Sequence, residues 1–261
     1  MENADDTFRL ATPADRQRVC ATIGAAFVTA ASPEMSYFFG DRFAELAPVF
    51  AGNLFDKRVA RSTVWVADDG DAAALWDAPE QTADASVGDR EDTTARAAPV
   101  LVPLPADVQE RLDKYEHIVH DLLPPQPHWY LGILARHPCR QGSGVARRLA
   151  QVALALASRD GIPAVLETTN PLNVAAYERA GWTIHAMNDE LQPAMRTWVM
   201  RHDGDRQSPE PEPSRSPSHR KTMTEQGPLP APTKGHEFSN GTALVAAAIR
   251  CACTQPQDPC L

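Results

Sequence analysis

The feature that most constrains this chain is a segment, residues 129–182, in which two strand patterns flank a glycine-rich turn and a helix pattern. Residues 129–135 form a short apolar run typical of a buried strand. Residues 141–146 are rich in glycine and lead into apolar residues at helical spacing, which end at Gly161 and Pro163. A second apolar strand, residues 164–167, follows. This order predicts an α/β fold with the turn at a helix N-terminus.

The turn is suited to bind a phosphate group. The first N–H groups of a helix have no partner within the helix, and the aligned peptide dipoles leave partial positive charge there. Gly142 and Gly144 carry no side chain that would keep a phosphate away from these donors. Arg140, Arg147 and Arg148 add positive charge nearby. The alternative is an ordinary loop that happens to contain two glycines.

Two other phosphate-binding patterns fit less well. A P-loop needs Lys and Ser or Thr after its last glycine, where this chain has Val145 and Ala146. A dinucleotide-binding fold would use Glu167 as the acid that binds the ribose. However, Arg147 stands in the place of the third glycine, and the glycines lie several residues past the strand. The dinucleotide-binding fold stays open as a disfavoured alternative.

Two motifs in this segment resemble those of the GNAT superfamily of N-acetyltransferases. Gln141-x-x-Gly144-x-Ala146 is similar to the superfamily signature that holds the pyrophosphate of acetyl-CoA, and residues 170–182 resemble its later Asn-x-x-x-Tyr-x-x-x-Gly-aromatic segment. The likeness covers residues 7–202 and is greatest to the puromycin N-acetyltransferases. The resemblance implies an α/β (α+β) GNAT fold, with a central mixed, splayed β-sheet flanked by helices.

The resemblance also implies the reaction and the cofactor site. The expected activity is direct transfer of an acetyl group from acetyl-CoA, the cosubstrate, to a primary amine. In the superfamily the coenzyme lies between two parted strands, and a backbone N–H of the first strand faces the thioester carbonyl. The residues that would contact acetyl-CoA here are Leu134, Ala135, Arg136, Gln141, Gly142, Ser143, Gly144, Val145, Ala146 and Asn173.

Four side chains have expected roles with stated alternatives. The resemblance makes Tyr177 the general acid near the coenzyme sulfur, although it could simply pack in the core. Glu167 is the candidate base, directly or through water, or else a solvated carboxylate at a strand end. Asn173 would bond the pantetheine arm or cap its own helix. Cys139, near a helix N-terminus and arginines, offers a rival acyl-enzyme route.

The expected acceptor is a small-molecule amine, with an aminonucleoside antibiotic such as puromycin as the specific candidate. Two alternatives stay open: an acyl-CoA-binding sensor or interaction module without turnover, and a protein N-acetyltransferase. The formal net charge of −9 belongs to residues 1–203, because residues 204–261 sum to zero. An acidic folded part argues against nucleic acid as a partner and favours approach of a cationic amine.

Composition and the remaining patterns complete the predictions. No apolar run reaches the roughly 18 residues of a membrane span, and the polar N-terminus resembles no signal peptide. We therefore expect a cytoplasmic monomer or homodimer that binds no membrane and no metal, and whose five cysteines form no disulfide framework. We predict three regions: an acetyltransferase domain in residues 1–203, a disordered Pro/Ser-rich linker in residues 204–235, and a C-terminal tail of unknown role in residues 236–261. Within the domain we predict strands at 7–11, 183–187 and 195–201, a helix opening at Thr12, an aromatic helical region at 38–55, a hairpin at 64–76, a mobile loop at 80–98 and a helix at 108–122.

Overall fold

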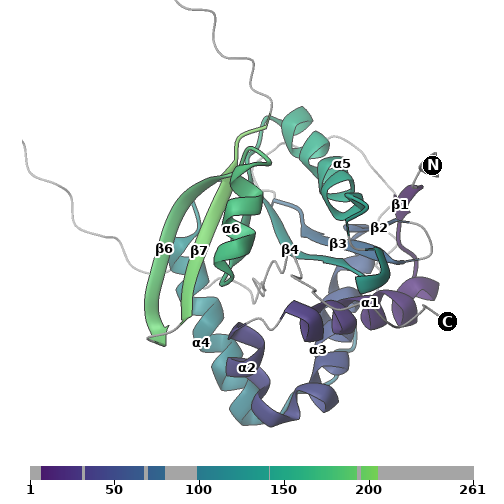
Figure 1. Cartoon of the computed structure of the whole chain (residues 1–261), viewed down its shortest axis with the longest axis vertical. Helices are drawn as coiled ribbons and strands as arrows, with labels where there is room; N and C mark the ends of the chain where they lie inside the picture. Colours follow the sequence, from purple (N-terminus) through teal and green to yellow (C-terminus); the bar gives the residue numbers. More distant parts are fainter. Residues whose placement is uncertain are drawn as a thin grey trace, which may run out of the picture.

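The computed structural model describes residues 7–30, 33–67, 70–79, 99–140, 142–192 and 195–204. In this part of the chain the fold is a seven-stranded mixed sheet with helices on both faces (Figure 1). The predicted loop at 80–98, Gln141, most of the predicted linker and the tail at 236–261 lie outside the described residues. The strands are β1 Phe8–Leu10, β2 Val64–Ala67, β3 Ala72–Asp77, β4 Trp129–Arg136, β5 Ala164–Thr168, β6 Thr183–Gln192 and β7 Met195–His202.

Four helices cover one face of the sheet, which is the lower face in the view of Figure 1. The predicted aromatic region forms two of them, separated by a short turn at Gly40–Arg42, and its rings pack in the core. Phe38 lies edge-on to Tyr115 with 5.2 Å between ring centroids. The region therefore serves the core. These helices are α1 Arg16–Ala30, α2 Pro33–Phe39, α3 Phe43–Val59 and α4 Ala106–Leu122.

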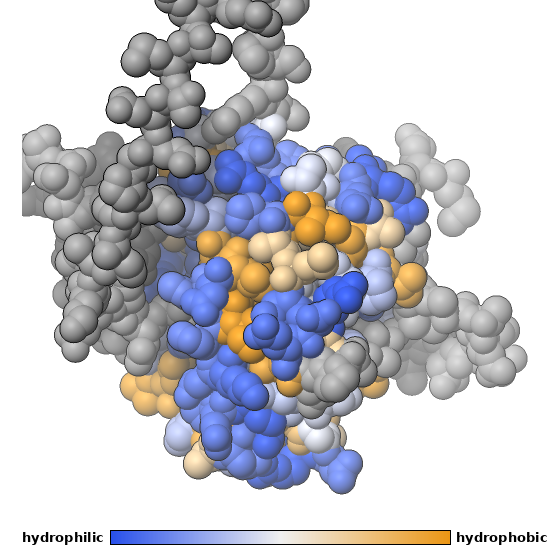
Figure 2. Space-filling view, turned by 90° about the vertical axis from the view of Figure 1, so that its left-hand side faces the viewer, coloured by the Kyte–Doolittle hydropathy of each residue, from blue (hydrophilic) through white to orange (hydrophobic). Residues whose placement is uncertain are grey.

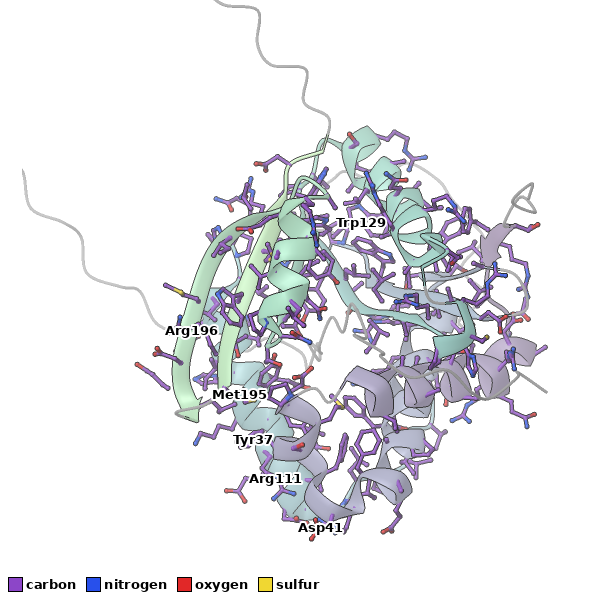
Figure 3. The ribbon with its side chains drawn as sticks, viewed as in Figure 1. Tyr37, Asp41, Arg111, Trp129, Met195 and Arg196 are labelled. Carbon is purple, nitrogen blue, oxygen red and sulfur yellow. The ribbon has the colours of Figure 1, made fainter. Side chains whose placement is uncertain are left out.

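Two helices, α5 Val145–Asp160 and α6 Pro171–Glu178, cover the other face. Helix α5 connects β4 to β5, which pair in parallel. It ends at Gly161, whose left-handed φ of +67° turns the chain back toward the sheet, as the sequence predicted. The indole N–H of Trp129 donates to Asp160 over 3.2 Å and joins the start of β4 to the end of α5 (Figure 3).

The sheet opens between its two central strands. β4 and β5 pair only at Trp129–Ala164, Tyr130–Val165 and Leu131–Leu166, although β4 continues to Arg136. Gly132 is an extra residue in β4, because the register with β3 moves from Leu131 to Ile133 between consecutive β3 residues. Past these pairs the strands separate, which confirms the splayed sheet that the resemblance implied.

The C-terminal hairpin completes the sheet in the order β1-β2-β3-β4-β5-β7-β6. β7 pairs antiparallel with both β5 and β6, so β6 is an edge strand. The side of the molecule that carries β6 and α6 has apolar patches among polar ones (Figure 2), and exposed apolar side chains there include Leu172, Ile184 and Met187. No helix in the described residues is long and apolar enough to cross a membrane.

Candidate active site

The glycine-rich turn leads into α5 in a conformation that needs glycine. Gly142 and Gly144 have φ angles of +80° and +75°, in the left-handed region that other residues rarely adopt. A Cβ atom at Gly144 would lie 3.2 Å from a guanidinium nitrogen of Arg148, which in turn donates to the carbonyl of Ser143 over 3.0 Å. The turn therefore brings backbone, rather than side chains, to the N-terminus of α5.

A cavity of about 760 Å³ lies beside this turn, between α5, α6 and the end of β4; we call it the α5–α6 cavity. Three arginines line it, and none of the described residues that line it is an Asp or Glu. Its positive lining and the helix N-terminus together favour a bound anion. The lining residues are Leu134, Arg136, Gly142, Gly144, Ala146, Arg147, Ala150, Gln151, Leu154, Ala155, Ser158, Asn173, Ala176, Tyr177, Arg179, Ala180, Trp182, His202 and Gly204.

The structure brings many of the predicted cofactor residues to this cavity. Ala135 and Val145 are instead core residues, 1% and 0% exposed, so only their backbone could meet a ligand. Ser143 is exposed in the turn, where its hydroxyl accepts from the Val145 N–H over 3.3 Å. Gln141 lies outside the described residues. Those that line the cavity are Leu134, Arg136, Gly142, Gly144, Ala146 and Asn173.

Sequence reasoning missed the rest of the cavity wall. Along α5 the wall continues from Ala146 through Ala150, Leu154 and Ser158, a four-residue spacing that places these mostly small side chains on one helix face. That spacing could have been read from the sequence. His202 comes from β7 and had no local signal; its ring lies 5.4 Å from that of Trp182, the aromatic residue at the end of the predicted motif.

Helix α6 presents two buried polar side chains to the cavity. Asn170 caps this helix, accepting from the Leu172 N–H over 2.9 Å, so Asn173 is not its cap. Asn173 donates to Thr168 over 3.2 Å, but its carbonyl oxygen has no hydrogen-bond partner among the described residues. The same is true of the Tyr177 hydroxyl, although Tyr177 is only 5% exposed. Both atoms are placed to bond a ligand in the cavity.

Burial also sets the protonation of Tyr177. Removal from water, with a smaller effect of the nearby Glu167 carboxyl, raises the pKa of the phenol well above its usual value. The phenol therefore keeps its proton at neutral pH and is a weaker acid than an exposed tyrosine. Its ring packs at 5.7 Å from Trp182, as the core-packing alternative expects, and the general-acid role stays a prediction.

Glu167 points away from the cavity. Its neighbour Leu166 packs with the α5–α6 layer, and successive strand residues alternate between faces, so Glu167 faces the layer of α1 to α4. It is 0% exposed and accepts a hydrogen bond from the phenol of Tyr130. The alternative of a solvated carboxylate is therefore wrong. A ribose-binding role is also incompatible with this face, because the glycine-rich turn lies on the other one.

The environment of Glu167 favours its protonated form. The pKa of Glu167 is raised to about 8: burial raises it most, the hydrogen bond from Tyr130 lowers it, and the carboxyl of Glu34 raises it. A group with this pKa can accept and release a proton near neutral pH, as a general base must. Perturbed carboxyls of this kind are common at active sites.

A second carboxyl, Glu34, lies in the same buried layer, and sequence reasoning missed it. Glu34 is 2% exposed on α2 and accepts a hydrogen bond from the hydroxyl of Thr169, just after β5. Tyr115 of α4 is fully buried near both carboxyls. Arg58 of α3, 1% exposed, is ion-paired with Asp77 at 2.5 Å. Four separate elements supply these groups, so no sequence motif could have indicated them.

Cys139 lies in the short turn Pro138–Arg140 and is exposed. Its sulfur is 2.9 Å from Nδ1 of His137, a contact that the sequence did not indicate. Cys139 is not among the residues that line the α5–α6 cavity. The rival acyl-enzyme route thus has its nucleophile outside the cavity wall.

One family model matches part of the chain. Residues 111–182 match the model of the Acetyltransferase (GNAT) family. The fold is similar to arylalkylamine N-acetyltransferase 2 from Aedes aegypti, with a TM-score of 0.53 and 13% identity over 77% of this chain and 99% of that one. A structure from Corynebacterium glutamicum described as "histone acetyltransferase HPA2 and related acetyltransferase" has a TM-score of 0.50 and 18% identity over 77% and 97%. These identities show a shared fold, and nothing in the matches supports a puromycin specificity.

Proposed function

We propose that the protein is an N-acetyltransferase of the GNAT family, which transfers an acetyl group from acetyl-CoA directly to a primary amine of a small molecule. The observation that carries this proposal is the arginine-lined cavity at the glycine-rich N-terminus of α5, beside the gap between β4 and β5. An aminonucleoside such as puromycin is the first acceptor to test, because the motifs of the sequence resemble those of enzymes that act on it. We assign the catalytic domain to residues 1–203.

The residues of the cavity fit acetyl-CoA. The backbone of the turn at Gly142 and Gly144, with Arg147 on the first turn of α5, would hold the pyrophosphate. The unpartnered carbonyl oxygen of Asn173 would accept an amide N–H of the pantetheine arm. When bound, acetyl-CoA supplies a thioester, an acyl group already activated for attack by an amine.

Three groups of the protein would each have a separate role in the acetyl transfer. The backbone of β4 around residues 134–136 would polarise the thioester carbonyl, and one such donor is worth ~3 kcal/mol in acyl-transfer enzymes. Glu167 would take the proton that the amine loses as its nitrogen bonds to the acyl carbon. Tyr177 would give its proton to the sulfur as the carbon–sulfur bond breaks, and the two side chains approach the gap from opposite faces of the sheet.

Thiol release from acetyl-CoA by the purified protein tests this function. The acceptor panel contains puromycin, an arylalkylamine and a peptide with a free N-terminus. Release with a small amine supports the proposal, whereas release with the peptide alone assigns a protein acceptor. Binding of acetyl-CoA by calorimetry with no release for any amine would make the protein a sensor instead. Growth on puromycin with and without expression of the chain then tests the specific acceptor.

A further inference from the structure

The described part of the chain ends at the α5–α6 cavity. Gly204, its last residue, lines this cavity together with His202, the last residue of β7. A Cβ atom at Gly204 would lie 2.7 Å from the hydroxyl oxygen of Ser158, so the chain passes tightly against the last turn of α5. Figure 1 shows the same arrangement, with β7 ending beside the C-terminal end of α5. Residues 205–261 therefore continue from the cavity wall itself.

The positive charge of the cavity comes from three elements. Arg136 ends β4, Arg147 lies in the first turn of α5 and Arg179 directly follows α6. Arg147 and Arg179 are exposed, and within the described residues neither takes part in an ion pair. No Asp or Glu is among the described lining residues to offset these charges. The cavity is therefore suited to an anionic segment of protein as well as to an anionic ligand.

The sequence just after Gly204 supplies such a segment. Residues 207–214 read Gln-Ser-Pro-Glu-Pro-Glu-Pro-Ser, with two carboxylates, Glu210 and Glu212, and no Lys or Arg. A proline on each side of both glutamates predicts an extended polyproline conformation, which loses little entropy on binding. We call residues 207–214 the acidic segment.

The acidic segment is long enough to reach the N-terminus of α5. Ser158 and Arg147 are about 17 Å apart along this helix, at a rise of about 1.5 Å per residue. A polyproline chain that starts at Gly204 covers about 19 Å by Glu210 and about 25 Å by Glu212. Because Gly204 packs on Ser158, a chain that follows α5 back along the cavity brings both carboxylates to Arg147.

We propose that the acidic segment occupies the arginine-lined cavity of its own chain and competes with acetyl-CoA for Arg147. The competition rests on the proposed function, because it takes acetyl-CoA as the ligand of this cavity. A tether of a few residues gives an effective concentration of about millimolar, so ion pairs of ordinary strength are sufficient. The segment then sets the concentration of acetyl-CoA that the enzyme needs, and salt releases it by screening the charges.

Modification by phenylglyoxal, which reacts with accessible arginines, tests the occupancy without acetyl-CoA. In the 261-residue chain at low salt, the rate at Arg147 should be about 3–10-fold lower than in the double variant Glu210→Gln/Glu212→Gln. Mass spectrometry of the digested protein measures the rate at each arginine. Equal rates at Arg147 in the two proteins overturn the inference. Protection that increases with protein concentration also overturns it, because a second copy is then the occupant.

Two controls make the modification experiment specific. Glu225→Gln/Glu237→Gln removes the same charge farther along the chain and should leave Arg147 as protected as in wild type. Equal loss of protection in this control overturns the assignment to the acidic segment. Arg159, at the other end of α5 and already paired with Asp160 at 3.2 Å, is the reference arginine and should react at one rate in all three proteins.

Calorimetry with acetyl-CoA tests the competition. At low salt the Kd should be about 3–10-fold lower in Glu210→Gln/Glu212→Gln than in wild type, and the difference should disappear at about 1 M salt. Glu225→Gln/Glu237→Gln should keep the wild-type Kd. Equal Kd values in all three proteins overturn the competition. If wild type binds no acetyl-CoA, the proposed function is refuted, and the protection of Arg147, which uses no acetyl-CoA, decides the occupancy.

Discussion

The phenol of Tyr130 donates a hydrogen bond to the carboxyl of Glu167 across the point where β4 and β5 separate. Tyr130 lies at a paired position of β4, and Glu167 follows the last paired residue of β5. The hydrogen bond stabilises the ionised carboxyl, whereas burial disfavours it, and the pKa of Glu167 of about 8 reflects both effects. The strength of the proposed base is therefore set by a residue on the neighbouring strand.

Tyr130→Phe should move the acid limb of kcat/KM to higher pH. Without the donor, the ionised form of Glu167 loses stabilisation and its pKa rises above about 8. Profiles measured with saturating acetyl-CoA check the prediction, with Tyr37→Phe on α2 as control. A limb that stays in place or moves to lower pH would contradict it.

Glu167→Gln should lower kcat by about 10²–10⁴-fold, the usual contribution of a general base. The affinity for acetyl-CoA should not change, because Glu167 faces away from the α5–α6 cavity. Steady-state kinetics and calorimetry on the same preparation measure the two quantities. Wild-type turnover in this variant would show that Glu167 is not the base and that water removes the proton of the amine.

Glu167→Gln should also change how stability depends on pH. The folded-state pKa of about 8 lies above the ordinary value of 4.5, so the folded protein binds more protons than the unfolded chain between these values. This contribution to stability is complete below the ordinary value and is lost as pH rises through about 8. The Tm of the variant, relative to that of wild type, should therefore increase as pH rises from about 5 to about 8.

Glu116→Gln separates stability from chemistry. Burial raises the pKa of Glu116, on α4, to about 8 as well, so this variant should show the same trend in Tm. Glu116 has no role in the proposed reaction, and kcat should stay at the wild-type value. A loss of turnover equal to that of Glu167→Gln would mean that buried charge, rather than proton transfer, controls the rate.

Tyr177→Phe should lower kcat by about 10²-fold, through loss of the proton donor to the leaving sulfur. Because the hydroxyl has no partner among the described residues, its removal should leave Tm unchanged or slightly raised. Thiol release and thermal unfolding measure the two effects. A variant with unchanged kcat would assign Tyr177 to packing against Trp182 alone.

Gly144→Ala should weaken binding of acetyl-CoA and lower stability. A left-handed φ of +75° costs a non-glycine residue about 1–2 kcal/mol, and the new Cβ would press on Arg148. Gly24→Ala is the matched control: its Cβ meets no atom within 4 Å in α1, and alanine favours the helix. Chemical denaturation and calorimetry should distinguish the two. Equal behaviour would show that the turn does not need glycine.

The elements of the fold could be predicted because each is encoded locally. The helix at Val145–Asp160 has regular apolar spacing and a glycine at its end, and the hairpin of β2 and β3 has a turn between two apolar runs. The position of β7 between β5 and β6 was not predicted, because strand order depends on contacts between distant residues. Periodicity identifies strands but does not order them.

The residues of the candidate site likewise include some that the sequence predicts and some that it does not. Gly144, Asn173 and Tyr177 belong to two continuous motifs, and the structure brings all three to one cavity. The burial of Glu167 and the presence of Glu34 could not be read, because neither has a local pattern. Glu34 reaches the site only when α2 packs beside the end of β5, a contact made across 135 residues.

The placement of β7 has a consequence for synthesis. β7 lies between β5 and β6 although it is the last strand of the described chain, so one side of β5 has no partner until residues 195–202 emerge from the ribosome. A nascent polypeptide that stops short of them contains the glycine-rich turn but lacks the strand that pairs with β5 at Glu167. Activity should thus begin only after β7 has been synthesised, and no fragment that ends before residue 195 should be active by itself.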